Sequence, residues 1–211
     1  MEPRFVYLVR VDVAHAREPL LNEVYDTDHI PTLLRVPGVL RVSRYRTAAA
    51  SEPRYQTMYE LTKPEVLESK EWQAAVDVGR WAPEVRPHIL NRHLVMYQSD
   101  QGDYDFSYTT PALHCEFLDV EGERDEHFRQ VCAGTIPLLK QVPGVQRVGL
   151  FVAVRDGKPS RLIISEMQRE DVVMSDDWRR ATKDGRWLDD IEPWIHNWHK
   201  VMYTRAPSFK R

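Results

Sequence analysis

Three residues near the start of the chain, Tyr25, Asp28 and His29, have side chains that could move a proton. Imidazole has an unperturbed pKa close to physiological pH, so His29 could act as a general acid or as a general base. Tyr25 precedes His29 by four residues, and on a helix this spacing places the two side chains on one face. A phenol beside an imidazole suits proton transfer to an oxygen-bearing substrate. We therefore expect a catalytic group in which His29 carries the proton and Tyr25 and Asp28 assist it.

A plainer interpretation of these residues stays open. His29 could be a helix residue that hydrogen-bonds to the backbone, and the residue types alone do not separate this role from catalysis. For Asp28, a solvated or locally paired carboxylate is the more frequent outcome. No metal-binding motif, Gly-rich phosphate loop or nucleophile elbow occurs in the chain. We therefore expect neither a metal site nor covalent catalysis.

The stretch that follows these residues recurs later in the chain. At a fixed offset of 106 positions, residues 30–45 match residues 136–151 at nine of sixteen positions. At the same offset, and without a gap, residues 69–97 match residues 175–203 at thirteen of twenty-nine positions. The two matches predict a tandem duplication of a unit of about 100 residues, and not a solenoid, because only two copies are present.

The two copies differ at the candidate catalytic positions. Where the first copy has Tyr25, Asp28 and His29, the second has Val131, Gly134 and Thr135. Residues that both copies share are expected to serve the fold, whereas residues of one copy alone are candidates for function. We therefore expect one working site, and we expect it in the first copy.

Hydrophobic periodicity predicts the order β-α-β-β-α-β in each copy. In the first copy, strands are expected at 5–13, 39–46, 55–61 and 88–97, and helices at 18–35 and 64–86. In the second copy, strands are expected at 112–119, 145–155, 160–168 and 195–204, and helices at 123–141 and 170–191.

This element order is that of a ferredoxin-like unit, whose antiparallel sheet carries both helices on one face. The other face of such a sheet needs a cover, which a second copy can supply. The predicted fold class is therefore α+β, with two ferredoxin-like halves packed sheet to sheet as an intramolecular α+β barrel. We place the first half at 1–98, a linker at 99–109 and the second half at 110–205.

Composition excludes several classes of partner. The formal net charge is -3 with both signs interspersed, which gives no basic footprint for nucleic acid. No apolar run approaches the roughly 20 residues that cross a bilayer, and the N-terminus lacks the form of a signal peptide. Cys115 and Cys132 have no metal or redox spacing, so we interpret them as two reduced thiols of a cytoplasmic protein.

The string Glu23-x-Tyr25-x-x-Asp28-His29-Ile30-Pro31-x-Leu33-Leu34-x-Val36-Pro37-Gly38-Val39 resembles the EthD-like family of dimeric α+β barrel proteins. With the region of Trp72, the resemblance covers most of the first half, and more weakly the second. It implies that His29 faces a cleft between the first helix and the sheet. It also implies a pseudo-dimer within one chain, because family members usually supply one unit per chain and dimerise. Relatives in the wider superfamily include cofactor-free monooxygenases, polyketide cyclases, lactone isomerases and haem-binding enzymes, and the EthD name itself comes from an association with ether degradation.

Four further residues are expected to bind substrate: Trp72, Trp81, Tyr45 and His93. Each tryptophan could form an aromatic wall for a flat ligand, or could simply pack in the core, because Trp178 and Trp187 recur at the matching positions. His93 recurs in the same way, as His199, so a structural role on the last strand is the alternative for it.

The sequence thus predicts a cytosolic, EthD-like small-molecule enzyme. We expect cofactor-free acid–base chemistry on an aromatic or polyketide-like carbonyl compound, as in a cyclase, isomerase or monooxygenase-like enzyme. A haem ligand stays open, because an axial histidine needs no local motif. The expected partner is a small-molecule ligand, with no nucleic acid and no membrane, and further oligomerisation is left open. The alternative is a non-catalytic binding or assembly protein that uses the same barrel.

Overall fold

The computed structural model describes residues 5–100, 104, 106–184 and 192–206. It is a mixed structure of helices and antiparallel strands. Contacts between residues divide the chain into two compact units, which we name by their described residues. The N-terminal unit comprises residues 5–96 with 205–206, and the C-terminal unit lies within residues 97–204.

The sheet of the N-terminal unit contains β1 (Phe5–Val13), β2 (Val39–Arg46), β3 (Tyr55–Leu61) and the first part of β4 (Ile89–Ser99). β3 lies between β1 and β2 and pairs antiparallel with both, and β4 lies beside β1. The sheet has a bulge in β2 between Val39 and Arg41. Because a bulge shifts the alternation of side chains by one residue, it turns Arg44 and not Tyr45 toward the helices.

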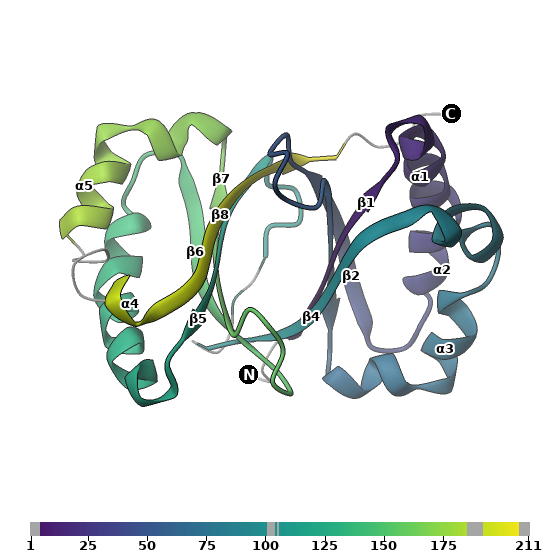
Figure 1. The fold of residues 1–211 in the computed structure, drawn as a ribbon, viewed down its shortest axis with the longest axis horizontal. Helices are drawn as coiled ribbons and strands as arrows, with labels where there is room; N and C mark the ends of the chain where they lie inside the picture. The colour runs from purple at the N-terminus through teal and green to yellow at the C-terminus, as the bar shows by residue number, and fades with distance from the viewer. Residues whose placement is uncertain (1–4, 101–103, 105, 185–191, 207–211) are drawn as a thin grey trace. The chain divides into compact units, whose positions relative to one another are not determined.

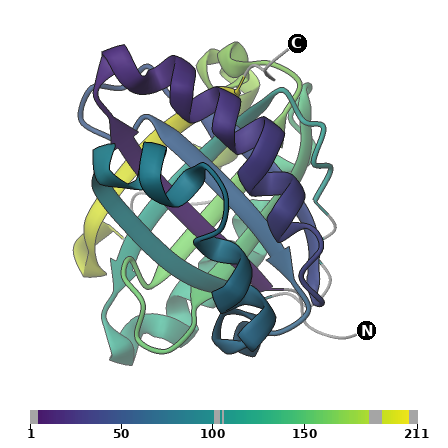
Figure 2. The same ribbon diagram turned by 90° about the vertical axis from the view of Figure 1, so that its right-hand side faces the viewer.

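Helices cover one face of this sheet, as Figures 1 and 2 show. The first helix is interrupted: after the short η1 (His15–Arg17), α1 (Glu18–Val24) leads into a π-helical turn, η2 (Tyr25–His29), and then into α2 (Ile30–Leu33). The later helical pieces are η3 (Pro64–Glu68), α3 (Lys70–Val76), the π-helical η4 (Trp81–Val85) and η5 (Arg86–His88). The predicted helical pieces over 64–86 are confirmed, whereas the helix predicted over 18–35 contains the unforeseen π turn.

Proline does not by itself explain this π turn. Pro31 lies just after it, but Pro137 lies inside α4 (Asp125–Leu139), which stays a regular α-helix. The π turn carries acidic side chains that reach other elements: Asp26 Oδ1 accepts a hydrogen bond from Arg44 Nη1 at 2.9 Å. π-helical turns are rare and occur frequently at functional sites, and this one carries both Tyr25 and His29.

The C-terminal unit has its own antiparallel sheet in the order β8-β5-β7-β6. These strands are β5 (Ala112–Val120), β6 (Val145–Ala153), β7 (Arg161–Met167) and β8 (Ile195–Arg205), whose last residue is counted with the N-terminal unit. The end of β4 joins this sheet by pairing Tyr97–Ser99 with β6. The helical pieces are η6 (Gly122–Arg124), α4, η7 (Glu170–Met174), α5 (Asp176–Asp184) and η8 (Glu192–Trp194).

Each unit has a hydrophobic core between its helices and its sheet. In the N-terminal unit, Leu21, Val24 and Leu33 from the helices are each at most 1% exposed. Burial of one such side chain contributes about 1.5–3 kcal/mol. In both units a serine begins the second helix: the Oγ atoms of Ser69 and Ser175 accept hydrogen bonds from the backbone N–H groups of Trp72 and Trp178.

Two predictions fall partly outside the described residues. The end of the helix predicted over 170–191, with Trp187, lies there, and so do residues 101–103 and 105 of the predicted linker. Among the helices of the described residues, none combines the length and apolar character that a membrane crossing requires.

Candidate functional site

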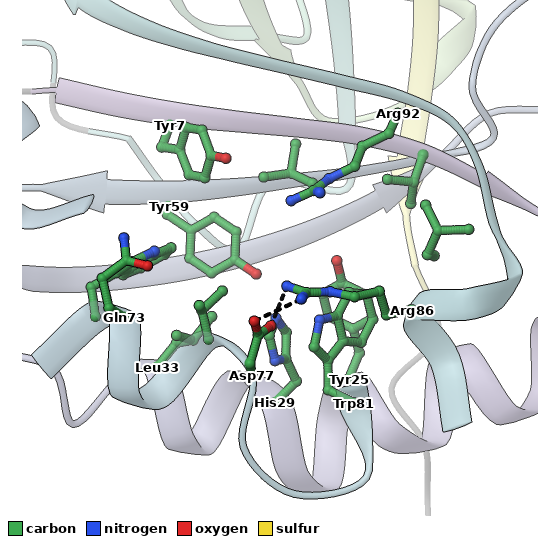
Figure 3. A pocket seen from close by; sticks show the side chains of 15 residues that line it. Tyr7, Tyr25, His29, Leu33, Tyr59, Gln73, Asp77, Trp81, Arg86 and Arg92 are labelled. Carbon is green, nitrogen blue, oxygen red and sulfur yellow. Dashed lines mark hydrogen bonds and ion pairs between the residues drawn. The ribbon is translucent and has the colours of Figure 1, made fainter. Parts of the chain in front are cut away.

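The N-terminal unit contains a cavity of about 240 Å³ between its helices and its sheet (Figure 3). The ring-bearing side chains that line it are Tyr7, Tyr25, His29, Tyr59, Trp72 and Trp81. The other polar lining residues are Gln73, Asp77, Arg86 and Arg92, and aliphatic residues complete the wall. Four predicted site residues therefore line one cavity, whereas Asp28, Tyr45 and His93 are not part of its lining.

His29 projects from the π turn and is 4% exposed. Its ring stacks on Trp81 with centroids 4.3 Å apart and meets the ring of Tyr25 edge-on at 5.3 Å. Within the described residues, its Nδ1 atom has no hydrogen-bond partner. Burial lowers the pKa of His29 to about 4, although the carboxylate of Asp28 opposes this shift. The imidazole is therefore neutral at physiological pH, and one of its two ring nitrogens carries a lone pair.

The phenol of Tyr25 lines the cavity but is almost fully buried, and it lies within a polar network. Thr57 and Tyr59 hydrogen-bond to it, and the guanidinium of Arg44 lies 4.3 Å from its ring centroid. Arg44 is held in turn by Asp26 and by Asn22, whose Oδ1 accepts from Arg44 Nη2 at 2.7 Å. Burial raises the pKa values of both Tyr25 and Tyr59, so both phenols keep their protons at neutral pH.

Asp28 lies beside the loop that leads to Trp81. Its Oδ2 atom accepts a hydrogen bond from the backbone N–H of Arg80 at 2.7 Å. Gly79 has a φ of +70°, and a Cβ atom there would lie 2.4 Å from the same oxygen. The absence of a side chain at Gly79 thus lets the carboxylate hold the turn that places Trp81 against His29. Asp28 therefore contacts the loop before Trp81 and is not part of the cavity lining, and its catalytic assistance stays a prediction.

Tyr45 and His93 are placed by irregularities in their strands. The bulge in β2 puts Tyr45 out of phase with Val39 and directs it away from the helix side of the sheet. In β4, Asn91 has a φ of +45°, and after it Arg92, not His93, lines the cavity. His93 is exposed. The predicted substrate-binding roles of Tyr45 and His93 are therefore not supported by their positions.

Sequence reasoning missed polar lining residues: Tyr7, Tyr59, Gln73, Asp77, Arg86 and Arg92. Strand alternation could have found Tyr7, because it shares a face of β1 with Val9 and Val11. Comparison of the copies could have found Arg92, because the second copy has Trp198 at the matching position and residues that differ between the copies are candidates for function. Tyr59 could have been found by the same alternation in β3, and Gln73 lies on α3 next to Trp72, whereas Asp77 and Arg86 lie where short helical pieces end and begin.

The segment of the C-terminal unit around Thr135 lines a far smaller space. That cavity measures about 10 Å³ and is bordered by Glu116, Thr135, Ile136, Leu139, Ile163 and Thr182. About one water molecule fills such a volume. Trp198 packs against the hydrophobic core of this unit, and its Nε1 donates to Glu116 Oε2 at 3.1 Å. Among the described residues, the space beside His29 can therefore hold a ring-sized ligand, whereas the space bordered by Thr135 is too small for one.

The part of the chain that the structure describes contains no group of three or more histidine, cysteine or acidic side chains arranged to hold a metal ion. Within the described residues both cysteines are buried and neither forms a disulfide, and burial raises the pKa of Cys132 above its ordinary value. This thiol is therefore protonated at neutral pH and unsuited to nucleophilic attack.

Replacing Asp28 with alanine is expected to lower the free energy of unfolding by about 1–2 kcal/mol, because a charge-assisted hydrogen bond to the Arg80 N–H is lost. Urea denaturation measures this loss. The near-ultraviolet circular dichroism signal of tryptophan should also decrease, because Trp81 is then held less rigidly. Asp176→Ala is the control, since the side chain of Asp176 is 88% exposed and pairs with the neighbouring Arg179. Equal unfolding midpoints for the two variants would contradict the positioning role of Asp28.

Comparison with family models finds no match, and no curated protein matches the chain. Solved structures do match it. A chlorite dismutase variant from Candidatus Nitrospira defluvii has a TM-score of 0.67 at 9% identity, covering 97% of this chain and 92% of the other. An anthrone oxidase-like protein has a TM-score of 0.63 at 10% identity, covering 98% and 92%.

A monooxygenase-like protein from Lactobacillus acidophilus has a TM-score of 0.60 at 8% identity, covering 97% of this chain and 94% of the other. Identities this low show the fold alone. The chain therefore shares the fold of dimeric α+β barrel proteins, among which are proteins named for small-molecule oxidation.

Proposed function

We propose that the N-terminal unit binds and converts a small molecule by acid–base chemistry that needs no cofactor. The substrate that fits this proposal is an aromatic or polyketide-like carbonyl compound. One observation carries the proposal: a cavity of about 240 Å³ has neutral His29 and the Tyr25–Tyr59 pair in its wall, while the Thr135 segment borders about 10 Å³.

The volume and lining of the cavity favour a flat ligand. A cavity of about 150 Å³ holds benzene, so the larger space here accepts a molecule of one or two rings. Trp72 meets the rings of Tyr7 and Tyr59 edge-on, at centroid distances of 6.1 and 5.9 Å, and these rings form a wall that can contact a planar ligand.

The protonation states suggest how the reaction proceeds. Neutral His29 takes a proton from the carbon next to the substrate carbonyl, which leaves an enolate. The protonated phenol of Tyr25 donates a hydrogen bond toward the enolate oxygen, and Tyr59, whose O–H donates to the Tyr25 oxygen, supports it. The imidazolium then returns the proton to another position, which gives an isomerised product. If the substrate has a second carbonyl group, the enolate carbon instead attacks that carbonyl carbon, and the imidazolium protonates the resulting alkoxide, which gives a cyclised product. A low pKa makes His29 a weak base, and the neighbouring enolate charge compensates by stabilising the imidazolium.

Proton exchange tests this proposal without knowledge of the natural substrate. Bicyclic aromatic ketones, beginning with 2-tetralone, are incubated with the protein in deuterium oxide, and loss of the α-proton signal is followed by NMR. The protein should accelerate exchange over buffer, and His29→Gln should reduce the acceleration at least a hundredfold, since general bases contribute about 10²–10⁴-fold. His15→Gln is the control, because the side chain of His15 is 91% exposed. No acceleration by the unaltered protein, or full activity of His29→Gln, would refute the mechanism.

A non-catalytic binding protein is the second candidate. The stacking of His29 on Trp81, with no polar side chain hydrogen-bonded to its Nδ1, favours this alternative. It predicts that aromatic ketones bind to the cavity but that their α-protons exchange at the rate of buffer alone.

We also propose that the chain is an EthD-like protein built by tandem duplication. Ferredoxin-like halves would then form a pseudo-dimer within one chain, with further self-association left open. Local details support the duplication: Gly38 and Gly144 have φ values of +92° and +93°, and Asn91 and Asn197 both have positive φ. Two buried cysteines that form no disulfide within the described residues support a cytoplasmic location. A degradative role for the enzyme follows from the family resemblance.

A further inference from the structure

The charges around the cavity do not balance. Arg86 is neutralised by Asp77, whose Oδ2 accepts a hydrogen bond from Arg86 Nη1 at 2.6 Å and whose Oδ1 lies close to Nη2. Arg92 is the second arginine of the lining. Among the described residues, no hydrogen bond or ion pair holds its guanidinium, which points toward the centre of the cavity in Figure 3.

The remaining ionisable groups of the lining do not offset this charge. His29 is neutral at physiological pH, because its pKa lies at about 4. Tyr7, Tyr25 and Tyr59 are neutral too, because burial raises their pKa values. Arg92 acts on two of these phenols at a distance and favours negative charge on Tyr7 and Tyr25. The cavity therefore carries one uncompensated positive charge.

Among the charged groups just outside the lining, Arg44 contacts Asp26, and the Arg80 side chain contacts Glu23 at 2.6 Å. Asp28 keeps its negative charge, but its carboxylate is turned to the backbone N–H of Arg80 and not into the lining. None of these carboxylates is part of the lining, so Arg92 is the cation that a bound molecule would meet.

We propose that the substrate is a planar aromatic carbonyl compound that bears one carboxylate, and that Arg92 binds this carboxylate. This inference rests on the proposed function, because it names the substrate class of the same cavity. A guanidinium presents a planar fork of donors that matches a carboxylate in two hydrogen bonds. The carboxylate would lie at the β4 side of the cavity, and the ring would lie against Trp72 and Tyr59, with its carbonyl group toward His29.

The position 106 residues later agrees with this assignment. Trp198 stands there, and its indole packs against the core of the C-terminal unit and donates to Glu116. The C-terminal unit thus has a bulky neutral residue where the N-terminal unit has Arg92, and it has the small cavity described above.

A matched pair of probes tests the proposal: 2-naphthoate and its neutral amide, 2-naphthamide. Fluorescence titration at neutral pH should show that the unaltered protein binds 2-naphthoate at least tenfold more tightly than 2-naphthamide. Arg92→Gln should weaken the binding of 2-naphthoate at least tenfold and leave the binding of 2-naphthamide unchanged. Arg92→Lys should keep part of the preference for 2-naphthoate over 2-naphthamide. Arg35→Gln is the control, because Arg35 is exposed and lies outside the lining.

The outcomes separate this inference from the proposed function. If both probes bind the unaltered protein equally well, the preference for an anion is overturned and the cavity remains a ligand site. If the preference survives in Arg92→Gln, another group binds the carboxylate and the inference is overturned. If neither probe binds, the cavity is not a site for aromatic ligands, and the proposed function falls together with the inference.

Discussion

Replacing Trp81 with alanine is expected to lower the free energy of unfolding by about 3–5 kcal/mol, the usual cost of deleting a buried tryptophan. The same change should raise the pKa of His29 from about 4 toward its ordinary value. Trp81 is 7% exposed and stacks on the imidazole at 4.3 Å, so its ring excludes water from one side of His29. Readmitted water stabilises the imidazolium, and the desolvation that lowers the pKa is relieved.

Urea denaturation gives the loss of stability, and NMR titration of the imidazole signals gives the pKa. Trp178→Ala is the matched control, because Trp178 is also 7% exposed, but in the C-terminal unit, where its ring lies edge-on to His114. It should destabilise the protein to a similar degree without changing the pKa of His29. Trp81→Phe keeps a ring and serves if the alanine variant does not fold. An unchanged His29 pKa in both Trp81 variants would show that other groups set it.

The strands, and the contact between Tyr25 and His29, were predictable because their side chains follow a regular spacing along the sequence. In β1, alternation places Tyr7, Val9 and Val11 on the face that meets the helices. The spacing of four residues brings Tyr25 and His29 together even though the backbone there forms a π turn. Residue type and spacing together are enough to predict such contacts, because they do not depend on whether the backbone forms α-helical or π-helical hydrogen bonds.

The errors lie where one residue breaks the period. The β2 bulge moves Tyr45 off the helix side and brings Arg44 over the ring of Tyr25. The left-handed backbone of Asn91 does the same in β4, so that Arg92 takes the place expected of His93. No proline or glycine lies between Val39 and Arg41 or at position 91. Asn91 is of a residue type that favours left-handed backbone, but this preference alone does not predict a kink within a strand. The role of Asp28 was missed for another reason, because its partner is a backbone N–H 52 residues away.

Stability should depend on pH through His29. Its pKa is about 4 in the folded protein and about 6.5 in the unfolded chain. Above pH 6.5 the imidazole is neutral in both states and contributes no difference. As the pH falls below 6.5, the unfolded chain binds a proton that the folded protein refuses, so folding becomes less favourable. The loss is complete below about pH 4 and amounts to about 3 kcal/mol.

His29→Phe isolates this contribution, because phenylalanine keeps a ring against Trp81 and cannot titrate. Urea denaturation at pH 7.5, 6, 5 and 4 should show that the unaltered protein loses about 3 kcal/mol more stability than His29→Phe over this range. His114 also has a pKa lowered by burial, but it is present in both proteins and cancels in the comparison. His15→Gln is the control for an exposed histidine and should follow the unaltered protein closely.

The result also bears on the chemistry of the cavity. If the two stability curves separate below pH 6.5 as expected, His29 is neutral throughout the physiological range, and it can begin a reaction only as a base or a hydrogen-bonding group. If the curves stay parallel down to pH 4, the folded protein accepts the proton on His29 as readily as the unfolded chain does. Half-protonated imidazole would then be present near pH 6.5, the cavity would carry additional positive charge, and His29 could begin the reaction as an acid.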